Sequence, residues 1–388
     1  MSSILSDNSP ASVSAERFDA IFGGQPTTAV KAPGRINLIG EHVDYQGGLV
    51  MPAAIDRYVF GAARAIPEAE VRLWSSSCGG RLVIPLDWAT PLGGEDRWAN
   101  YAFGVIAKYR AAGYPITGFE AAFVSDLPLG AGLSSSAALE SATAVIAESL
   151  AGIELPPTER ALLCQSAEHD WAGVPCGIMD QLAVNAGVGG HALIIDCQSL
   201  EYRPAALPPE LSIVVVDSKV KHALADGEYA RRKADCESAA AALECARLHE
   251  VSLPQLETAK GALGDRVYRR ARHVVTEIGR VRCFVDALAA ADIAAVGRLM
   301  AASHRSLHHD FEVSCVELDC LVEIASELGA FGSRMMGGGF GGSTVNLVSK
   351  AGAQDFADRI IARYREMHGA ELESFIVHPV DGAKRVEG

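Results

Sequence analysis

The sequence is short of positive charge and of long apolar runs. Its 388 residues hold 34 Lys and Arg against 48 Asp and Glu, which gives a net charge of −14. General binding to nucleic acids or anionic membranes needs the opposite balance. No apolar run approaches the roughly 18 residues of a membrane-spanning helix. We therefore expect no nucleic-acid and no membrane partner, while a local site for one nucleotide and any protein partner stay open.

Cysteine motifs and targeting signals are also missing. The nine cysteines include no C-x-x-C pair, so neither a zinc ribbon nor a disulfide framework is indicated. Residues 1–10 lack the charged-then-apolar pattern of a secretory signal. We expect reduced thiols and a cytoplasmic protein. The length predicts two domains, and the proline-containing segment 204–209 is the candidate linker, which gives units of 1–205 and 206–388.

The chain is rich instead in small residues at one loop, PLGAGLSSSAALE at 128–140. Gly130 and Gly132 let the backbone approach a ligand closely, and serines 134–136 stand where an alanine-rich helix begins. The free N–H groups at a helix start favour an anion. Alone, a glycine turn with a serine N-cap is the commoner interpretation. The pattern is not a P-loop, because G-x-x-x-x-G-K-[ST] is absent. With the strand predicted at 118–124 before it, the loop indicates a phosphate site.

A second unusual segment, PGRINLIGEHVDYQGG, occupies residues 33–48. It sets charged and imidazole groups among four glycines, and its apolar residues would anchor it in a core. Polar groups on an anchored loop are typical of a binding site, although a polar surface loop is the simpler alternative. The candidate side chains are Arg35, Glu41, His42 and Asp44.

A third segment, GVPCGIMDQ, covers residues 173–181. An aspartate in a turn is commonly a cap. Here Ile178 and Met179 would partly bury Asp180, and a buried carboxylate needs a partner. Arg35 is the candidate partner.

Two further patterns do not indicate the sites that they suggest at first. Residues 337–342 fit G-x-G-x-x-G, but they open a β-branched run at 343–348 rather than a helix. We expect a close approach of backbones there, not a dinucleotide site. His304 and His308 lie four residues apart near Asp310, yet the spacing supplies no third ligand, so we interpret them as solvated or capping groups.

Periodicity predicts a three-stranded meander and several helices in the rest of the chain. The strands of the meander are expected at 58–65, 71–75 and 81–86, with Gly79-Gly80 as a hairpin turn. Ser314 and Glu317 fit a capping box for the last of these helices. The helices are expected at 228–248, 267–289, 293–303 and 315–328.

Together these segments resemble, in order and spacing, the motifs of the GHMP small-molecule kinases. The segment of residues 34–48 is similar to the sugar signature of those members that phosphorylate galactose, although Val43 stands where many relatives have Thr. The resemblance spans residues 27–348. The similar segments are 34–48, 128–137, 176–181, 303–314 and 337–342.

The resemblance implies a two-domain α+β fold. The N-terminal domain would be similar to ribosomal protein S5, the C-terminal domain would be ferredoxin-like, and the active site would lie between them. It also implies an ATP-dependent sugar 1-kinase of galactose metabolism, which transfers the γ-phosphoryl group of ATP to the C1 hydroxyl of galactose with Mg²⁺ as cofactor.

The same resemblance implies roles for individual residues. Asp180 would be the base or would orient the hydroxyl, and Arg35 beside it would keep it ionised. Ser136 and Glu168 would hold Mg²⁺. The ATP phosphates would contact Gly130, Ala131, Gly132, Leu133, Ser134, Ser135 and Ser136. Galactose would contact Glu41, His42, Asp44, Gly177, Asp180 and Tyr229.

Two alternatives remain at this point. One is a kinase of the same family for another sugar, such as N-acetylgalactosamine or arabinose. The other is a galactose sensor that keeps the fold without catalysis. The presence of Ser136, Glu168, Asp180 and Arg35 weighs against the sensor, because a sensor has less need of all four.

Overall fold

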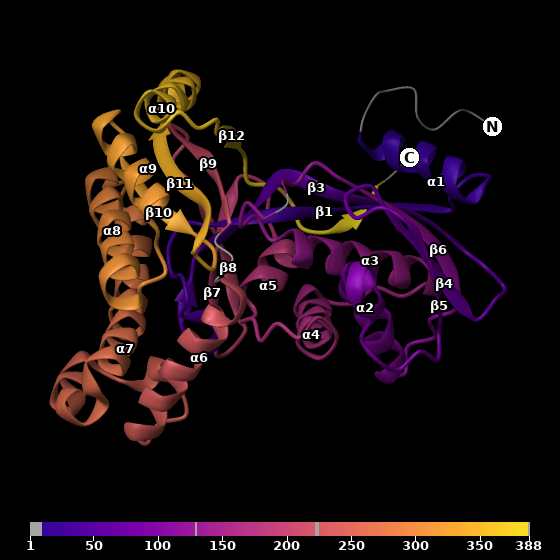
Figure 1. Cartoon of the computed structure of the whole chain (residues 1–388), viewed down its shortest axis with the longest axis horizontal. Coiled ribbons are helices and arrows are strands. Elements are labelled where there is room, and N and C mark those ends of the chain that lie inside the picture. The colour runs from indigo at the N-terminus through magenta and orange to yellow at the C-terminus, as the bar shows by residue number, and fades with distance from the viewer. Residues whose placement is uncertain (1–9, 129, 222–224, 387–388) are drawn as a thin grey trace.

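The computed structural model describes residues 10–128, 130–221 and 225–386, which form an α+β fold of two domains side by side (Figure 1). The helices are α1 (Pro10–Phe22), α2 (Ala99–Ala111), α3 (Ser135–Ala151), α4 (Pro157–Ala167), α5 (Met179–Ala186), α6 (Ala225–Ala242), α7 (Leu253–Ala289), α8 (Ile293–Ser306), α9 (Val316–Glu327) and α10 (Ala353–His368). Among the described residues, every helix is too short or too polar to cross a membrane.

Three sheets organise the strands. The first has the order β13-β1-β3-β6-β4-β5, the second β10-β11-β9-β12 and the third β2-β7-β8. The strands are β1 (Thr28–Asn37), β2 (Leu49–Val50), β3 (Pro52–Ala65), β4 (Glu70–Ser75), β5 (Arg81–Pro85), β6 (Phe119–Ser125), β7 (His191–Asp196), β8 (Tyr202–Ala206), β9 (Leu211–Lys221), β10 (Gly332–Met336), β11 (Gly341–Ser349), β12 (Glu373–Val377) and β13 (Lys384–Arg385).

The N-terminal sheet is mixed, because β4 and β6 run parallel while its other pairs are antiparallel. Helices α2 to α5 lie along one face and α1 along the other (Figure 1). The predicted hairpin of β4 and β5 at Gly79-Gly80 is confirmed. The three-stranded meander was wrong, since β6 enters between β3 and β4. Residues 119–123 of β6 are buried, and a strand buried in this way takes an interior place in a sheet.

Strand β1 continues into the segment of residues 33–48, and this extension positions the site. It continues past a register shift between Pro33 and Gly34 to Asn37. A Cβ on Gly34 would lie 2.7 Å from the carbonyl oxygen of Leu133, so only glycine fits there. The Arg35 N–H donates to the same carbonyl over 3.1 Å, which joins β1 to the small-residue loop.

The C-terminal domain is ferredoxin-like, as the resemblance implied. Its strands run in the spatial order β12-β9-β11-β10, all antiparallel, which is the split β-α-β arrangement. Several helix ends differ from expectation. Helix α6 ends at Ala242, and α7 begins at Leu253 and tolerates a break at Gly264 (φ +71°). The hydroxyl of Ser314 bonds to Asp319 instead of capping α9, whose N-cap is Cys315.

The end of the chain returns to the N-terminal domain. We call residues 378–386 the C-terminal strap. Gly382 N–H donates to Gly187 O (2.9 Å) and Ala383 N–H donates to Val184 O (2.8 Å), both at the end of α5. Strand β13 then pairs with β1. The strap therefore joins the two domains, while the boundary at 205/206 stays a prediction.

Candidate active site

Segments from both domains converge on one small cavity. It has a volume of about 160 Å³, small beside the pockets that hold drug-sized ligands. All the residues predicted to contact the sugar line it, and they come from the loop after β1, the loop before α5, α5 itself and α6. The lining residues are Arg35, Glu41, His42, Asp44, Glu168, Val174, Cys176, Gly177, Met179, Asp180, Tyr229, Gly337 and Gly338.

Asp180 and Arg35 form the predicted pair. The Arg35 Nε and Nη2 atoms donate to the two carboxylate oxygens of Asp180 over 2.8 and 2.7 Å, and Nη1 donates to Gly132 O. Burial acts to lower the pKa of Arg35, but the charges of Asp180 and Glu41 outweigh it and raise that pKa. The guanidinium therefore stays charged and links the carboxylate to the small-residue loop.

Ser134 occupies the N-cap position of α3 without capping it through its side chain, so the simpler N-cap interpretation of the serine run does not hold for this residue. It stands at the start of α3 with φ of +58°, and its side chain makes no capping bond. Its hydroxyl donates to Asp180 Oδ2. The sequence analysis missed this hydrogen bond. Three consecutive serines were the available signal, because a helix start needs only one of them as its N-cap and another can bond elsewhere. Ser135 and Ser136 follow in the first turn of α3, both half-buried.

The glycine cluster 337–342 backs the loop of residues 130–136. A Cβ on Gly132 would lie 3.5 Å from Met336 O, and one on Gly342 would lie 3.6 Å from Ala131 O. Ser343 Oγ also donates to Ala131 O over 2.7 Å. The cluster connects β10 to β11, not a strand to a helix. The prediction of a close backbone approach is confirmed.

Loop 40–48 presents three predicted residues to the cavity. Glu41 Oε1 accepts from Gly337 N–H (2.8 Å) and pairs with the buried Arg334 (3.2 Å). Burial, helped by His273, lowers the pKa of His42 to about 3, so its ring is neutral. His42 Nε2 lies 3.2 Å from Gly338 O and therefore carries the proton, since a carbonyl can only accept.

Asp44 and Tyr229 meet at this cavity from different domains. Burial, and then Asp180, raise the pKa of Asp44 to about 7. The Tyr229 ring centroid lies 5.4 Å from that of His42. Gly177 is required here, because a Cβ would stand 1.8 Å from Asp44 Oδ2.

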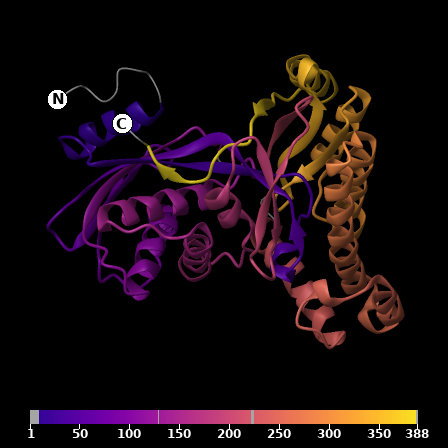
Figure 2. The same cartoon turned by 180° about the vertical axis from the view of Figure 1, so that it is seen from behind.

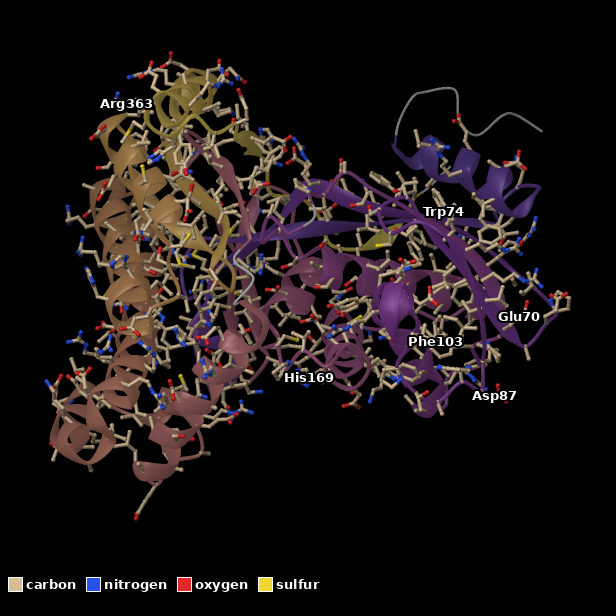
Figure 3. All side chains as sticks on the ribbon, in the orientation of Figure 1. Glu70, Trp74, Asp87, Phe103, His169 and Arg363 are labelled. Atoms are coloured by element: carbon tan, nitrogen blue, oxygen red, sulfur yellow. The ribbon has the colours of Figure 1, made fainter. Side chains whose placement is uncertain are left out.

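Glu168 belongs to a buried acidic group beside the cavity. It begins a π-helical turn after α4 that also carries His169, labelled in Figure 3. Gln181 Nε2 donates to Glu168 Oε2 (2.6 Å) and to Glu140 Oε2 (3.1 Å). Burial, followed by Asp180, raises the pKa of Glu168 to about 7, and burial raises the pKa of Glu140 well above its usual range. Sequence reasoning missed Glu140 and Gln181, and the available signal was an acidic residue, Glu140, in the first half of an alanine-rich helix.

A hard divalent cation suits this acidic group. Glu140 Oε1 is buried with no hydrogen-bond partner, and carboxylate oxygens such as those of Glu140 and Glu168 are ligands that Mg²⁺ prefers. Within the described ranges, no three His, Cys, Asp or Glu side chains form a metal-binding group on their own. Mg²⁺ in kinases commonly takes its other ligands from substrate phosphates and water.

The two histidines with helical spacing are engaged with an acid instead. His304 Nε2 lies 3.3 Å and His308 Nδ1 lies 2.6 Å from the two carboxylate oxygens of Asp319. His304 is buried rather than solvated, and its Nδ1 accepts from the Met335 N–H over 3.3 Å.

The two-domain fold and the loop of residues 130–136 define the chain first as a GHMP kinase. Family models described as the GHMP kinases N-terminal domain and GHMP kinases C-terminal match residues 100–187 and 284–366. A mevalonate kinase structure aligns with a TM-score of 0.66 over 92% of this chain and all of that chain, at 18% identity. That likeness concerns the fold alone.

Closer similarities identify the family. A galactokinase galactose-binding signature matches residues 16–65. The chain is 47% identical to human galactokinase over 375 residues, 95% of this chain and 94% of that protein, and 43% identical to galactokinase of Chloroflexus aggregans, over 92% and 93%. A Lactococcus lactis galactokinase structure, complexed with galactose, aligns with a TM-score of 0.91 and 33% identity over 96% of this chain and 98% of that one. The chain belongs to the galactokinase family. It is thus an ATP-dependent sugar kinase, with ATP as a substrate.

Proposed function

We propose that this protein transfers the γ-phosphoryl group of ATP to the C1 hydroxyl of galactose, yielding galactose 1-phosphate and ADP. The observation that carries the proposal is the Arg35–Asp180 pair, which lies on a small polar cavity and is bonded directly to the loop of residues 130–136. The pair thus stands where a sugar in the cavity and phosphates on the loop would meet.

Asp180 is the residue we assign to the sugar hydroxyl. Its carboxylate accepts the C1 hydroxyl hydrogen, orients the oxygen, and takes the proton as the new O–P bond forms and the bond to ADP breaks. Arg35 and Ser134 hold the carboxylate in place. Arg35 also supplies positive charge near the phosphoryl group in transit.

The loop and the start of α3 are assigned to the nucleotide. Backbone N–H groups of residues 130–136 would cradle the ATP phosphates. Ser136 and Glu168 would hold Mg²⁺ directly or through water, and the buried, unpartnered oxygen of Glu140 supports a cation nearby. Bound Mg²⁺ supplies charge neutralisation for the phosphates.

Sugar choice is assigned to the other cavity residues. Glu41, His42, Asp44, Gly177 and Tyr229 offer several acceptors and donors for hydroxyl groups. A site built to bond one axial hydroxyl leaves buried groups unpaired when that hydroxyl is equatorial. We also place the protein in a reducing compartment, the cytoplasm, since all nine cysteines are free thiols.

ADP production on a panel of sugars tests the proposal. The assay uses ATP and Mg²⁺ with galactose, glucose, N-acetylgalactosamine and arabinose, and Asp180→Asn as the control for contaminating kinases. We expect galactose to give the highest kcat/KM. A higher value on another sugar would identify a kinase for that sugar, and galactose binding without ADP release would identify a sensor.

A further inference from the structure

Helix α7 contacts loop 40–48, and α8 packs against α7. The indigo segment that carries this loop reaches toward the long helices of the C-terminal domain in both views (Figures 1 and 2). His273 and Glu277, one turn apart on α7, are both fully buried. Neither has a role in the chemistry assigned above.

These two side chains bond to the backbone of the loop. Glu277 Oε1 accepts from the Gly40 N–H over 3.0 Å. His273 Nε2 lies 3.0 Å from Glu41 O and donates to it, because a carbonyl oxygen only accepts. The bonded groups are the N–H of Gly40 and the carbonyl of Glu41. They flank the peptide bond between these two residues, next to His42.

Two serines of α8 support the same side chains. Ser303 Oγ donates to Glu277 Oε1 over 2.6 Å, and Ser306 Oγ lies 3.0 Å from His273 Nδ1. Both serines are buried. Segment 303–314, which the sequence singled out without a role, thereby acquires one.

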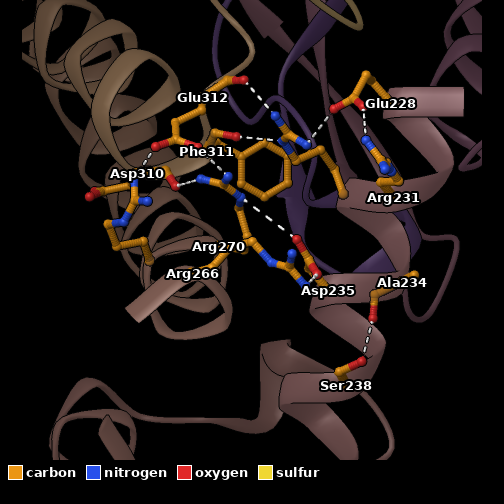
Figure 4. A network of polar contacts seen from close by, with 12 residues as sticks. Glu228, Arg231, Ala234, Asp235, Ser238, Arg266, Arg270, Asp310, Phe311 and Glu312 are labelled. Atoms are coloured by element: carbon orange, nitrogen blue, oxygen red, sulfur yellow. Dashed lines mark hydrogen bonds and ion pairs between the residues drawn. The ribbon is translucent and has the colours of Figure 1, made fainter. Parts of the chain in front are cut away.

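The turn after α8 completes the support through Phe311. Its ring centroid lies 4.8 Å from that of His42 and 4.6 Å from that of His273. Arg232 donates to Phe311 O over 2.7 Å, and Figure 4 shows Phe311 beside the polar network of Arg270, Asp310 and Glu312. Phe311 therefore stands between the α7 histidine and the cavity histidine.

The backbone of the loop needs such support. Gly40 has φ of +98° and His42 has φ of +58°, in the left-handed region that side chains rarely adopt. A non-glycine residue persists there when its surroundings hold it. A Cβ on Gly40 would also lie 2.9 Å from Leu49 O.

We propose that His273 and Glu277 are positioning residues that set loop 40–48 for the sugar, so that the C-terminal domain helps to determine sugar affinity. The inference rests on the proposed function. It predicts that loss of these bonds weakens sugar binding and leaves the nucleotide site unchanged.

His273→Phe tests this, because it keeps a ring against Phe311 and removes the N–H donor. We expect the galactose Kd, measured by calorimetry without ATP, and the galactose KM to rise about ten-fold, with the ATP KM changed less than about two-fold. His273→Gln keeps an N–H at the Nε2 position and should restore most of the affinity. Tyr109→Phe is the matched control, since it removes a buried bond to Glu148 (2.6 Å) in the N-terminal domain; it should lower stability only.

Equal changes in the galactose and ATP constants, or a stability loss with an unchanged galactose Kd, would overturn the proposal. Should His273→Phe fail to fold, Ser306→Ala removes only the supporting hydroxyl. The proposal then requires the galactose constants of this variant to change more than its ATP KM. If wild-type protein neither binds nor phosphorylates galactose, the proposed function fails, and the split is measured with the sugar that the panel identifies.

Discussion

Asp180 and Asp44 lie in one cavity, yet their surroundings treat their charges differently. Arg35 bonds to both oxygens of Asp180. In the described part of the chain no cation pairs with Asp44, and burial with the nearby charge of Asp180 raises its pKa to about 7. Asp44 therefore titrates near neutral pH, while Asp180 is the carboxylate held by Arg35.

Replacing Asp180 with Asn is expected to abolish most turnover while leaving sugar binding largely intact. The amide keeps the shape but cannot accept a proton, and proton acceptors of this kind contribute about 10²–10⁴-fold. The measurements are kcat from ADP release and galactose Kd by calorimetry. Turnover near the wild-type rate would remove Asp180 from the role assigned to it.

The pKa of Asp44 predicts a pH-dependent stability in the ligand-free protein. Its folded pKa of about 7 lies above the ordinary 3.8, so the folded state holds a proton that the unfolded chain releases between these values. This stabilisation is complete below about pH 4 and is lost as pH rises through 7. Relative to Asp44→Asn, wild-type protein should lose unfolding free energy from pH 5 to 8, measured by urea denaturation. A constant difference across that range would contradict the assignment.

For individual residues, the sequence predicted an ion pair of two side chains but missed hydrogen bonds that join three or more side chains. The Arg35–Asp180 pair was predictable because a buried acid requires a cation. The Ser134 bond to Asp180 and the Glu140–Gln181–Glu168 group were not, since they depend on how α3, α4 and α5 pack. Residue type alone does not give that packing.

Among the elements, α3 is the one whose start we assign to the ATP phosphates. Its predicted first turn begins as expected, and its alanines, such as Ala138 and Ala142, are fully buried. Small side chains let the helix lie close to the strands it covers. The helix start is thus fixed against β1 and β3.

Ser136→Ala is expected to raise the Mg²⁺ concentration needed for half-maximal activity about ten-fold, with a smaller change in the galactose KM. The substitution removes one oxygen donor at the start of α3 and favours the helix itself. A Mg²⁺ titration at saturating galactose measures the half-maximal Mg²⁺ concentration. A sugar titration at saturating Mg²⁺ measures the galactose KM. If the Mg²⁺ curves of wild type and Ser136→Ala superimpose, Ser136 does not bind Mg²⁺ and serves only as a residue of the helix.

Element types were more predictable than their neighbours in the sheets. Alternation and turn residues gave β3, β4 and β5, but not the insertion of β6 between β3 and β4, because strand pairing is set by burial over long separations. Helix α7 began fourteen residues earlier than the expected 267, at Leu253. Its first turns include Gly261 and Gly264, which weaken the local helix signal.

Over the whole molecule, the C-terminal strap joins the domains at the end of α5, the helix that carries Asp180. Its contacts involve backbone atoms of Gly187 and Val184. Backbone bonds of this kind leave no side-chain pattern, so the sequence did not predict the return of the chain. The two-domain fold itself followed from the motifs.

Gly382→Ala is expected to destabilise the protein by about 1–3 kcal/mol. The added Cβ would stand 2.3 Å from the backbone oxygen of Asn185, behind α5. Gly93→Ala is the control, because a Cβ there meets nothing within 4 Å and φ is −113°. Urea denaturation of both variants measures the difference. Equal midpoints would mean that the strap adapts without cost.

Strands β1 and β13 run antiparallel, with Val30 opposite Arg385 and Lys31 opposite Lys384. The start of β1 and the finish of β13 therefore sit at the same edge. Tension applied between the two ends of the polypeptide would load this pair like a zipper, so that its hydrogen bonds give way singly rather than together. Detachment of the strap would release one connection between the two domains, while the contacts of His273 and Gly337 with Glu41 would remain.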